Sequence, residues 1–228
     1  MGLFKKKNDN QMDVKSVELY DETEFEELES YITSTFGEME NVFHEVYSPD
    51  IHVDIAIIPP NEHDHFYKLI TMGMGAHDMN IPSEIAEYEL SNAELMIYLP
   101  CDWDIYQNNQ NENNYWPIRW LKILARMPIN YATWLGHGHT ISVGKDHETL
   151  SENNQFESIA LVEACDRHGE IACCRLSTGK LIRFYQMLPL YDEELQLKVQ
   201  YESIDTLLEK FDDDFSYVVD IHRKHYLK

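Results

Sequence analysis

The sequence predicts an α+β protein in which a mixed, largely antiparallel sheet packs with helices. Two observations lead to this fold class. Several short apolar segments lie between turn residues with the alternation of strands, and segments with helical spacing separate them. The chain also has no internal repeat and no linker rich in Pro, Gly or Ser. We therefore expect a flexible leader at 1–18 and a single domain at 19–228.

The first expected element is an amphipathic helix within 21–37. Asp21 or Thr23 supplies the N-terminal cap, and Gly37 ends the helix. Many of the remaining positions are Glu, which predicts an acidic outer face. The apolar positions recur at helical spacing and are Phe25, Leu28, Ile32 and Phe36.

Four strands are expected in the first half of the chain. Residues 41–58 indicate two strands on either side of a turn at 48–50, and residues 65–72 indicate a third. The fourth, at 93–100, is apolar on both of its faces. Such a strand is buried on both sides, so we expect it at the centre of the sheet.

The second half begins with a helix at 116–128, with Pro117 in its first turn. Three further strands follow, and the chain then ends in two helical segments and a strand-like or helical tail. One face of the helix at 116–128 is apolar and is formed by Trp116, Trp120, Ile123, Leu124 and Met127.

The charge of the chain is strongly unbalanced, with 41 Asp and Glu against 18 Lys and Arg and a net charge of −23. This charge repels nucleic acids and anionic membranes, and it favours rapid association with a basic protein partner. No apolar run approaches the roughly 20 residues of a membrane span. The four cysteines lie in apolar runs, so we expect buried free thiols and a cytoplasmic location.

The eleven histidines raise the question of a metal site. The metallo-hydrolase pattern H-x-H-x-D-H would start at His137 but fails at Ile141 and Ser142, and the zincin pattern H-E-x-x-H is absent. Neither a G-x-S-x-G elbow nor a phosphate-binding glycine loop is present. We expect no catalytic residue, no bound metal, no cofactor and no small-molecule substrate. A metal-dependent enzyme is kept as an alternative, with candidate ligands His52, Asp54, His63, His65 and His77.

Aromatic residues are concentrated between positions 116 and 134. They form either part of the core or an aromatic cleft that receives a peptide, and the sequence leaves both interpretations open. The candidate partner-binding residues are Asp54, Trp116, Trp120, Trp134, His137 and His139.

An ordered series of segments resembles the suppressor of fused (SUFU) domain in its bacterial form. The resemblance runs from about Val42 to about Phe211, and its most specific part is a strand with Pro-Pro, then LITMGM, then ELMIYLP. The full series is SPDIHVDIAIIPP, FYKLITMGMGAHDM, AELMIYLP with Trp103 after it, WLKILARMP, WLGHGHT and LPLYDEEL.

The resemblance implies a non-enzymatic protein-binding module with a SUFU-like α+β fold. Bacterial members of the family are inferred to be immunity proteins or antitoxins of polymorphic toxins, including LXG-type toxins with nuclease domains. The partner expected from this is a basic toxin domain. An alternative function is that of a regulatory adaptor that binds a peptide by strand addition, as the animal relatives do.

Overall fold

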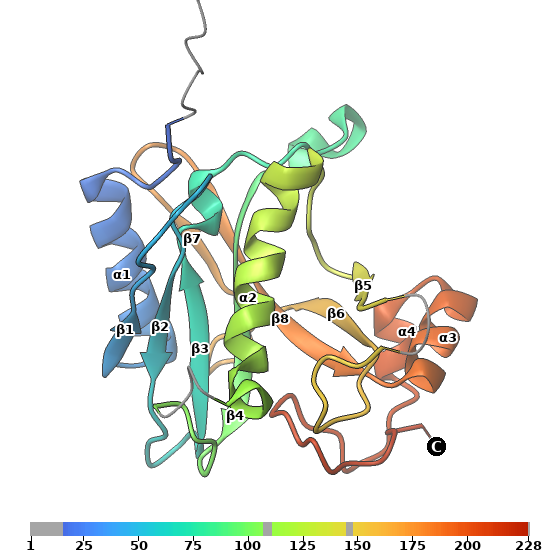
Figure 1. Ribbon diagram of the computed structural model, residues 1–228. Helices are drawn as coiled ribbons and strands as arrows, with labels where there is room; N and C mark the ends of the chain where they lie inside the picture. The colour runs from blue at the N-terminus through green and yellow to red at the C-terminus, as the bar shows by residue number, and fades with distance from the viewer. Residues whose placement is uncertain (1–15, 107–110, 145–147, 228) are drawn as a thin grey trace, which may run out of the picture.

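The computed structural model in Figure 1 describes residues 16–106, 111–144 and 148–227 of the chain. Residues 1–15, most of the predicted leader, lie outside the described residues. Glu18, within the predicted leader, pairs with Ile51 as an isolated bridge.

The elements follow the chain in an order that mixes helices and strands. They are α1 (Glu22–Phe36), β1 (Asn41–Phe43), β2 (Asp54–Ile58), β3 (Phe66–Met72), η1 (Met74–Ala76), η2 (Ser83–Tyr88), β4 (Asn92–Pro100), α2 (Glu112–Tyr131), β5 (Thr140–Ser142), β6 (Ser158–Glu163), β7 (Cys173–Arg175), β8 (Leu181–Leu190), α3 (Asp192–Tyr201) and α4 (Ile204–Leu208).

The strands form one sheet in the order β1-β2-β3-β4-β8-β6-β5, and β7 pairs with β8. Every pairing between named strands is antiparallel except that of β4 with β8. This confirms the predicted α+β class with a mixed, largely antiparallel sheet. It also places β4 near the middle of the sheet, as its apolar sequence predicts.

Helices α1 and α2 cover opposite faces of the sheet (Figure 1). The alternation of β4 shows this division, because Leu95 and Ile97 pack in the cluster under α2 while Met96 packs in the cluster under α1. A third, smaller cluster lies between β6, β8 and the C-terminal helices. Two helices on one sheet therefore give a three-layer core.

Helix α1 has the predicted boundaries. Asp21 caps it, accepting from the backbone N of Glu24 at 2.9 Å, while the Glu24 carboxylate accepts from the backbone N of Asp21. Gly37 follows its last residue at a φ of 125°, which favours glycine. The predicted apolar face is buried at Leu28, Ile32 and Phe36.

Helix α2 differs from its prediction at its start and on one face. Asn111 caps it, so Pro117 lies inside the helix and not in its first turn. Ile123, which lies on the predicted apolar face, is 44% exposed. The helix begins earlier than predicted because Asn111 supplies its cap and Glu112 lies in its first turn, and it also continues past Pro128 to Tyr131.

The predicted burial of the cysteines is wrong for two of the four. Cys101 and Cys165 are exposed, Cys173 is partly buried and Cys174 is buried, and all four are free thiols. Cys101 follows the end of β4, and Cys165 has only an isolated bridge to Ile171 after β6. Both sit where a strand ends and its neighbours no longer cover the side chain.

The C-terminal segment forms neither a strand nor a helix, in contrast to the predicted tail. It returns to the sheet through two isolated bridges, Tyr98 with Val218 and Phe211 with Leu227. The first bridge lies where β4 and β8 cease to pair, after Met96. The segment therefore fills the gap between the separating ends of these two strands.

Candidate functional site

The structure separates the six predicted partner-binding residues. Trp116, Trp120 and Asp54 are buried, with exposed fractions of 0%, 7% and 4%. The two tryptophans belong to the core under α2. Core packing is one of the two interpretations that the sequence left open. Asp54 lies on β2, which β3, β4, β8 and β6 separate from β5 in the sheet order. These residues do not form one surface, and their role in binding stays a prediction.

Trp134, His137 and His139 do lie together, between the end of α2 and β5. The rings of Trp134 and His139 pack edge to face with centroids 4.2 Å apart. Burial lowers the pKa of His139, so its imidazole is favoured in the neutral form. The segment is fixed to β6 by a hydrogen bond from the N of Gly138 to the O of Leu161, at 2.8 Å.

The geometry of His137 determines its neutral tautomer. Its Nδ1 lies 3.1 Å from the backbone N of Glu163 and therefore accepts a hydrogen bond. The proton of the neutral ring is then on Nε2, which lies 3.1 Å from Oδ1 of Asp205 in α4. His137 thus joins β6 to α4, and its two nitrogens are already engaged.

The other histidines of the metal hypothesis lie in three separate places. His52 and His44 both contact Asp54, at 3.1 and 2.9 Å, while Ser48 occupies the second nitrogen of His52 at 2.8 Å. His77 pairs with Glu18 at 2.7 Å. His63 and His65 are exposed in the turn before β3. Within the described residues, no group of three or more His, Cys, Asp or Glu is arranged to hold a metal ion.

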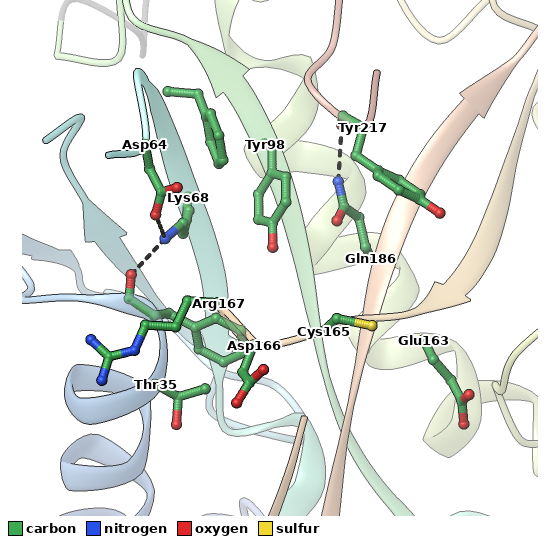
Figure 2. A pocket seen from close by; sticks show the side chains of 12 residues that line it. Thr35, Asp64, Lys68, Tyr98, Glu163, Cys165, Asp166, Arg167, Gln186 and Tyr217 are labelled. Carbon is green, nitrogen blue, oxygen red and sulfur yellow. Dashed lines mark hydrogen bonds and ion pairs between the residues drawn. The ribbon is translucent and has the colours of Figure 1, made fainter. Parts of the chain in front are cut away.

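A pocket of ≈ 250 Å³ opens beside the gap between β4 and β8 (Figure 2). Lys68 closes one end, where its Nζ donates to Oδ2 of Asp64 at 2.6 Å and to the O of Phe36 at 2.7 Å. Tyr98 stands in the middle of the pocket. At the other end Nε2 of Gln186 donates to the backbone O of Tyr217, at 2.9 Å.

Two titratable groups of this pocket, Tyr98 and Cys165, are favoured in their neutral forms, while backbone hydrogen bonds lower the pKa of Asp166 and favour its charged form. Burial raises the pKa of Tyr98 well above its ordinary value of 10.0. Burial and then the Glu163 carboxylate raise the pKa of the Cys165 thiol. A thiol with a raised pKa is a poor nucleophile at neutral pH, so these residues suit contact with a polar surface better than covalent chemistry.

Glu94, on β4, is a buried carboxylate that accepts several hydrogen bonds. Its Oε1 accepts from the hydroxyl of Tyr20 at 2.8 Å and from the backbone N of Gly73 and Gly75 at 2.9 and 3.1 Å. Its Oε2 accepts from the hydroxyl of Thr71 at 2.5 Å. Glu94 is 0% exposed, and burial raises its pKa above 4.5 despite these donors.

The two glycines explain the sequence pattern that follows β3. A Cβ at Gly73 would lie 1.9 Å from the backbone O of His52, and the φ of 144° is one that favours glycine. A Cβ at Gly75 would lie 2.2 Å from the hydroxyl of Tyr20. The run from Thr71 to Gly75 is thus a turn around the Glu94 carboxylate. Its two glycines are required by the close packing of this turn.

A pH titration tests the raised pKa of Glu94. Because the native state holds this proton more tightly than the unfolded state, the contribution of Glu94 to stability is full below about pH 4.5 and is lost as the pH rises through the folded pKa. We expect the difference in unfolding free energy between the wild type and Glu94→Gln to fall as the pH rises above 4.5 in urea titrations.

Glu89→Gln provides a control of opposite sign, because a hydrogen bond from Arg175 lowers the pKa of Glu89. The contribution of that carboxylate is present above about pH 4.5 and is lost as the pH falls. A flat or rising difference for Glu94→Gln would contradict the assignment.

None of the helices in the described parts of the chain has the length and hydrophobicity that crossing a bilayer requires.

Together, these features define an α+β domain with one mixed sheet, a buried carboxylate on β4 and an open pocket beside the gap between β4 and β8. The family model for the suppressor of fused protein (SUFU) matches residues 49–224. The chain belongs to this family, and the resemblance seen in the sequence is confirmed.

The relatives extend over most of the chain. The uncharacterised protein UU111 of Ureaplasma parvum serovar 3 is 28% identical over 214 residues, which cover 92% of this chain and 98% of that protein. A crystal structure of a SUFU homologue from Neisseria gonorrhoeae FA 1090 matches with a TM-score of 0.60 at 17% identity, over 90% of this chain and 97% of that one.

Two further solved structures share this fold. The structure of the Sufu–Fu complex matches with a TM-score of 0.62 at 13% identity, over 89% of this chain and 91% of that one. Drosophila Suppressor of Fused matches with a TM-score of 0.53 at 14% identity, over 88% of this chain and 49% of that one. The present chain therefore corresponds to about half of the Drosophila protein.

Proposed function

We propose that this protein is a non-enzymatic, cytoplasmic protein-binding module that acts as the immunity partner of a basic toxin domain. The observation that carries the proposal is the net charge of −23 on a chain of this family. The solved Sufu–Fu complex is that of a relative with another protein, which supports a binding role for the fold.

The charge supports a basic partner for a physical reason. A nuclease toxin is positively charged where it meets nucleic acid, and an acidic protein covers that surface in place of the phosphates. Complementary charges raise the association rate at low salt, and screening reduces it at high salt. An immunity protein benefits from rapid capture, since the toxin acts on the producing cell until it is bound.

The test is coexpression with the product of the neighbouring gene. We expect a complex that copurifies, relief of the growth defect that this product causes alone, and an association rate that falls about tenfold or more from low salt to 0.5 M salt. The control is an unrelated protein of similar size and net charge, which should neither bind nor protect. Absence of a complex together with undiminished toxicity would overturn the proposal.

A second candidate function, that of an adaptor which binds a peptide by strand addition, is favoured by the position of β5. This short strand ends the sheet order, and Trp134 and His139 pack next to it. The bridge of Val218 with Tyr98 also resembles an added strand. His139 hydrogen-bonds to β6 and Val143 to the residue before it, so the alternate residues Thr140 and Ser142 present their N–H groups to the free edge. Slowed amide exchange at Thr140 and Ser142 in a complex would favour this function over binding through side chains alone.

A further inference from the structure

An apolar groove with an acidic rim lies between α1, the segment before it and the beginning of β2. It encloses ≈ 520 Å³. Leu19, Phe25 and Met72 are among the residues that line it, and Leu19 is 64% exposed. An exposed leucine beside an open apolar hollow is a typical feature of an interaction surface.

The rim of the groove carries acidic side chains on one side of α1. Glu22, Glu26 and Glu29 line it, and all three are exposed. Their spacing of four and then three residues places them in a row about 10 Å long, at a rise of roughly 1.5 Å per residue. None of the residues that line the groove is Lys or Arg, and the single histidine among them is His52.

Two further carboxylates of the groove are already engaged. Asp21 caps α1, accepting from the backbone N of Glu24. Asp54 accepts from the backbone N of Glu45 at 2.8 Å and contacts two histidines. The three rim glutamates are therefore the groups with which a basic ligand would pair.

We propose that this groove docks a short segment of the partner in which Lys or Arg residues flank large apolar side chains. The inference rests on the proposed function, because it names the surface that receives the basic partner. Apolar side chains would enter beside Leu19 and Phe25, and the cations would pair with the row of glutamates. A second copy of this chain is a poor occupant, since each copy has a net charge of −23.

The test uses the full chain and a fluorescein-labelled peptide that alternates Lys pairs with Leu-Phe pairs. We expect saturable binding by fluorescence anisotropy, weakened about tenfold by the triple substitution Glu22→Gln, Glu26→Gln and Glu29→Gln. A peptide with Ser in place of Leu-Phe should bind at least about tenfold more weakly, because it loses apolar burial. Leu19→Gln should weaken the Leu-Phe peptide but leave the Ser peptide unchanged.

A matched control separates the groove from the overall charge. The substitutions Glu84→Gln, Glu87→Gln and Glu193→Gln change the net charge equally at exposed positions on η2 and α3. We expect this variant to bind the peptide within about twofold of the wild type. Equal weakening by the two triple variants would overturn the proposal, because the peptide would then be attracted by the net charge of the protein and not by the groove. Thermal melting checks that both variants fold.

Occupation of the groove by this chain's own leader or by a second copy of the chain would give different results. Leu3 and Phe4 precede Lys5, Lys6 and Lys7 in this chain's own leader. If replacement of these three lysines by Gln tightened peptide binding about tenfold, the leader would be the occupant and the proposal would fail. A dimer in sedimentation experiments that Leu19→Gln dissociates would also overturn it.

The toxin assay distinguishes this inference from the proposed function. Protection by the wild type and loss of protection in the rim variant would support both. Equal protection by the wild type and the rim variant would overturn the groove and leave the immunity function standing. Failure of the wild type to protect, with peptide binding that depends on the rim, would overturn the immunity function and leave the groove.

Discussion

Replacement of Glu94 by Ala is expected to destabilise the domain by about 3–5 kcal/mol, which is much of the stability of a typical domain. The substitution removes the common acceptor of three backbone N–H groups, those of Gly73, Met74 and Gly75. Each buried donor that loses its partner costs roughly 1–3 kcal/mol. The hydroxyls of Tyr20 and Thr71 lose the same acceptor.

Urea denaturation followed by circular dichroism measures this effect, and Glu62→Ala is the matched control because Glu62 is exposed in the turn before β3. We expect the control to remain within about 0.5 kcal/mol of the wild type. Thr71→Val should fall between the two, since it removes one donor to Glu94 and the acceptor of the Leu95 backbone N but leaves the carboxylate in place. If Glu94→Ala unfolded at the same urea concentration as the wild type, the buried carboxylate would not be the centre of the turn.

Replacement of Arg223 by Met is expected to cost about 3–5 kcal/mol, because it leaves Glu194 as a buried charge without its partner. Glu194 is 0% exposed, and its two oxygens lie 2.7 and 2.8 Å from the guanidinium nitrogens. The guanidinium also lies 4.2 Å from the ring centroid of Tyr226 and donates to the O of Pro189. One side chain thus fixes the C-terminal segment to α3 and β8.

Arg223→Lys separates the contributions to this effect. Lysine keeps the charge but loses the second parallel hydrogen bond and the planar stacking, so an intermediate loss is expected. Arg167→Met is the control, since Arg167 is exposed. Amide exchange should be faster at Val219, whose N donates to the O of Tyr98, in Arg223→Met than in the control. Equal stability of Arg223→Met and Arg167→Met would contradict this account.

The sequence predicts those parts of the fold whose causes are local. The cap, the apolar spacing and the glycine stop of α1 lie within 21–37, and the structure has the helix there. The apolar sequence at 93–100 places β4 inside the sheet for a similar reason, because burial on both faces leaves no polar face to alternate. The family follows from the order of such segments.

Features that depend on tertiary contacts could not be predicted in this way. Glu94 is a single acidic residue in an apolar strand, and its donors are near positions 20 and 73. The helical spacing of the tryptophans is compatible with a core and with a cleft, and only packing against the sheet shows that Trp116 is buried. The groove beside α1 joins Leu19 to Met72, so no local pattern reveals it.

The most direct test of the central claim is isothermal titration of the purified protein with the product of the neighbouring gene, at two salt concentrations. We expect a 1:1 complex whose affinity falls with added salt, and a matching loss of toxicity in cells that express both proteins. If the gene product were basic and toxic but did not bind this protein at either salt concentration, the proposed immunity function would be contradicted.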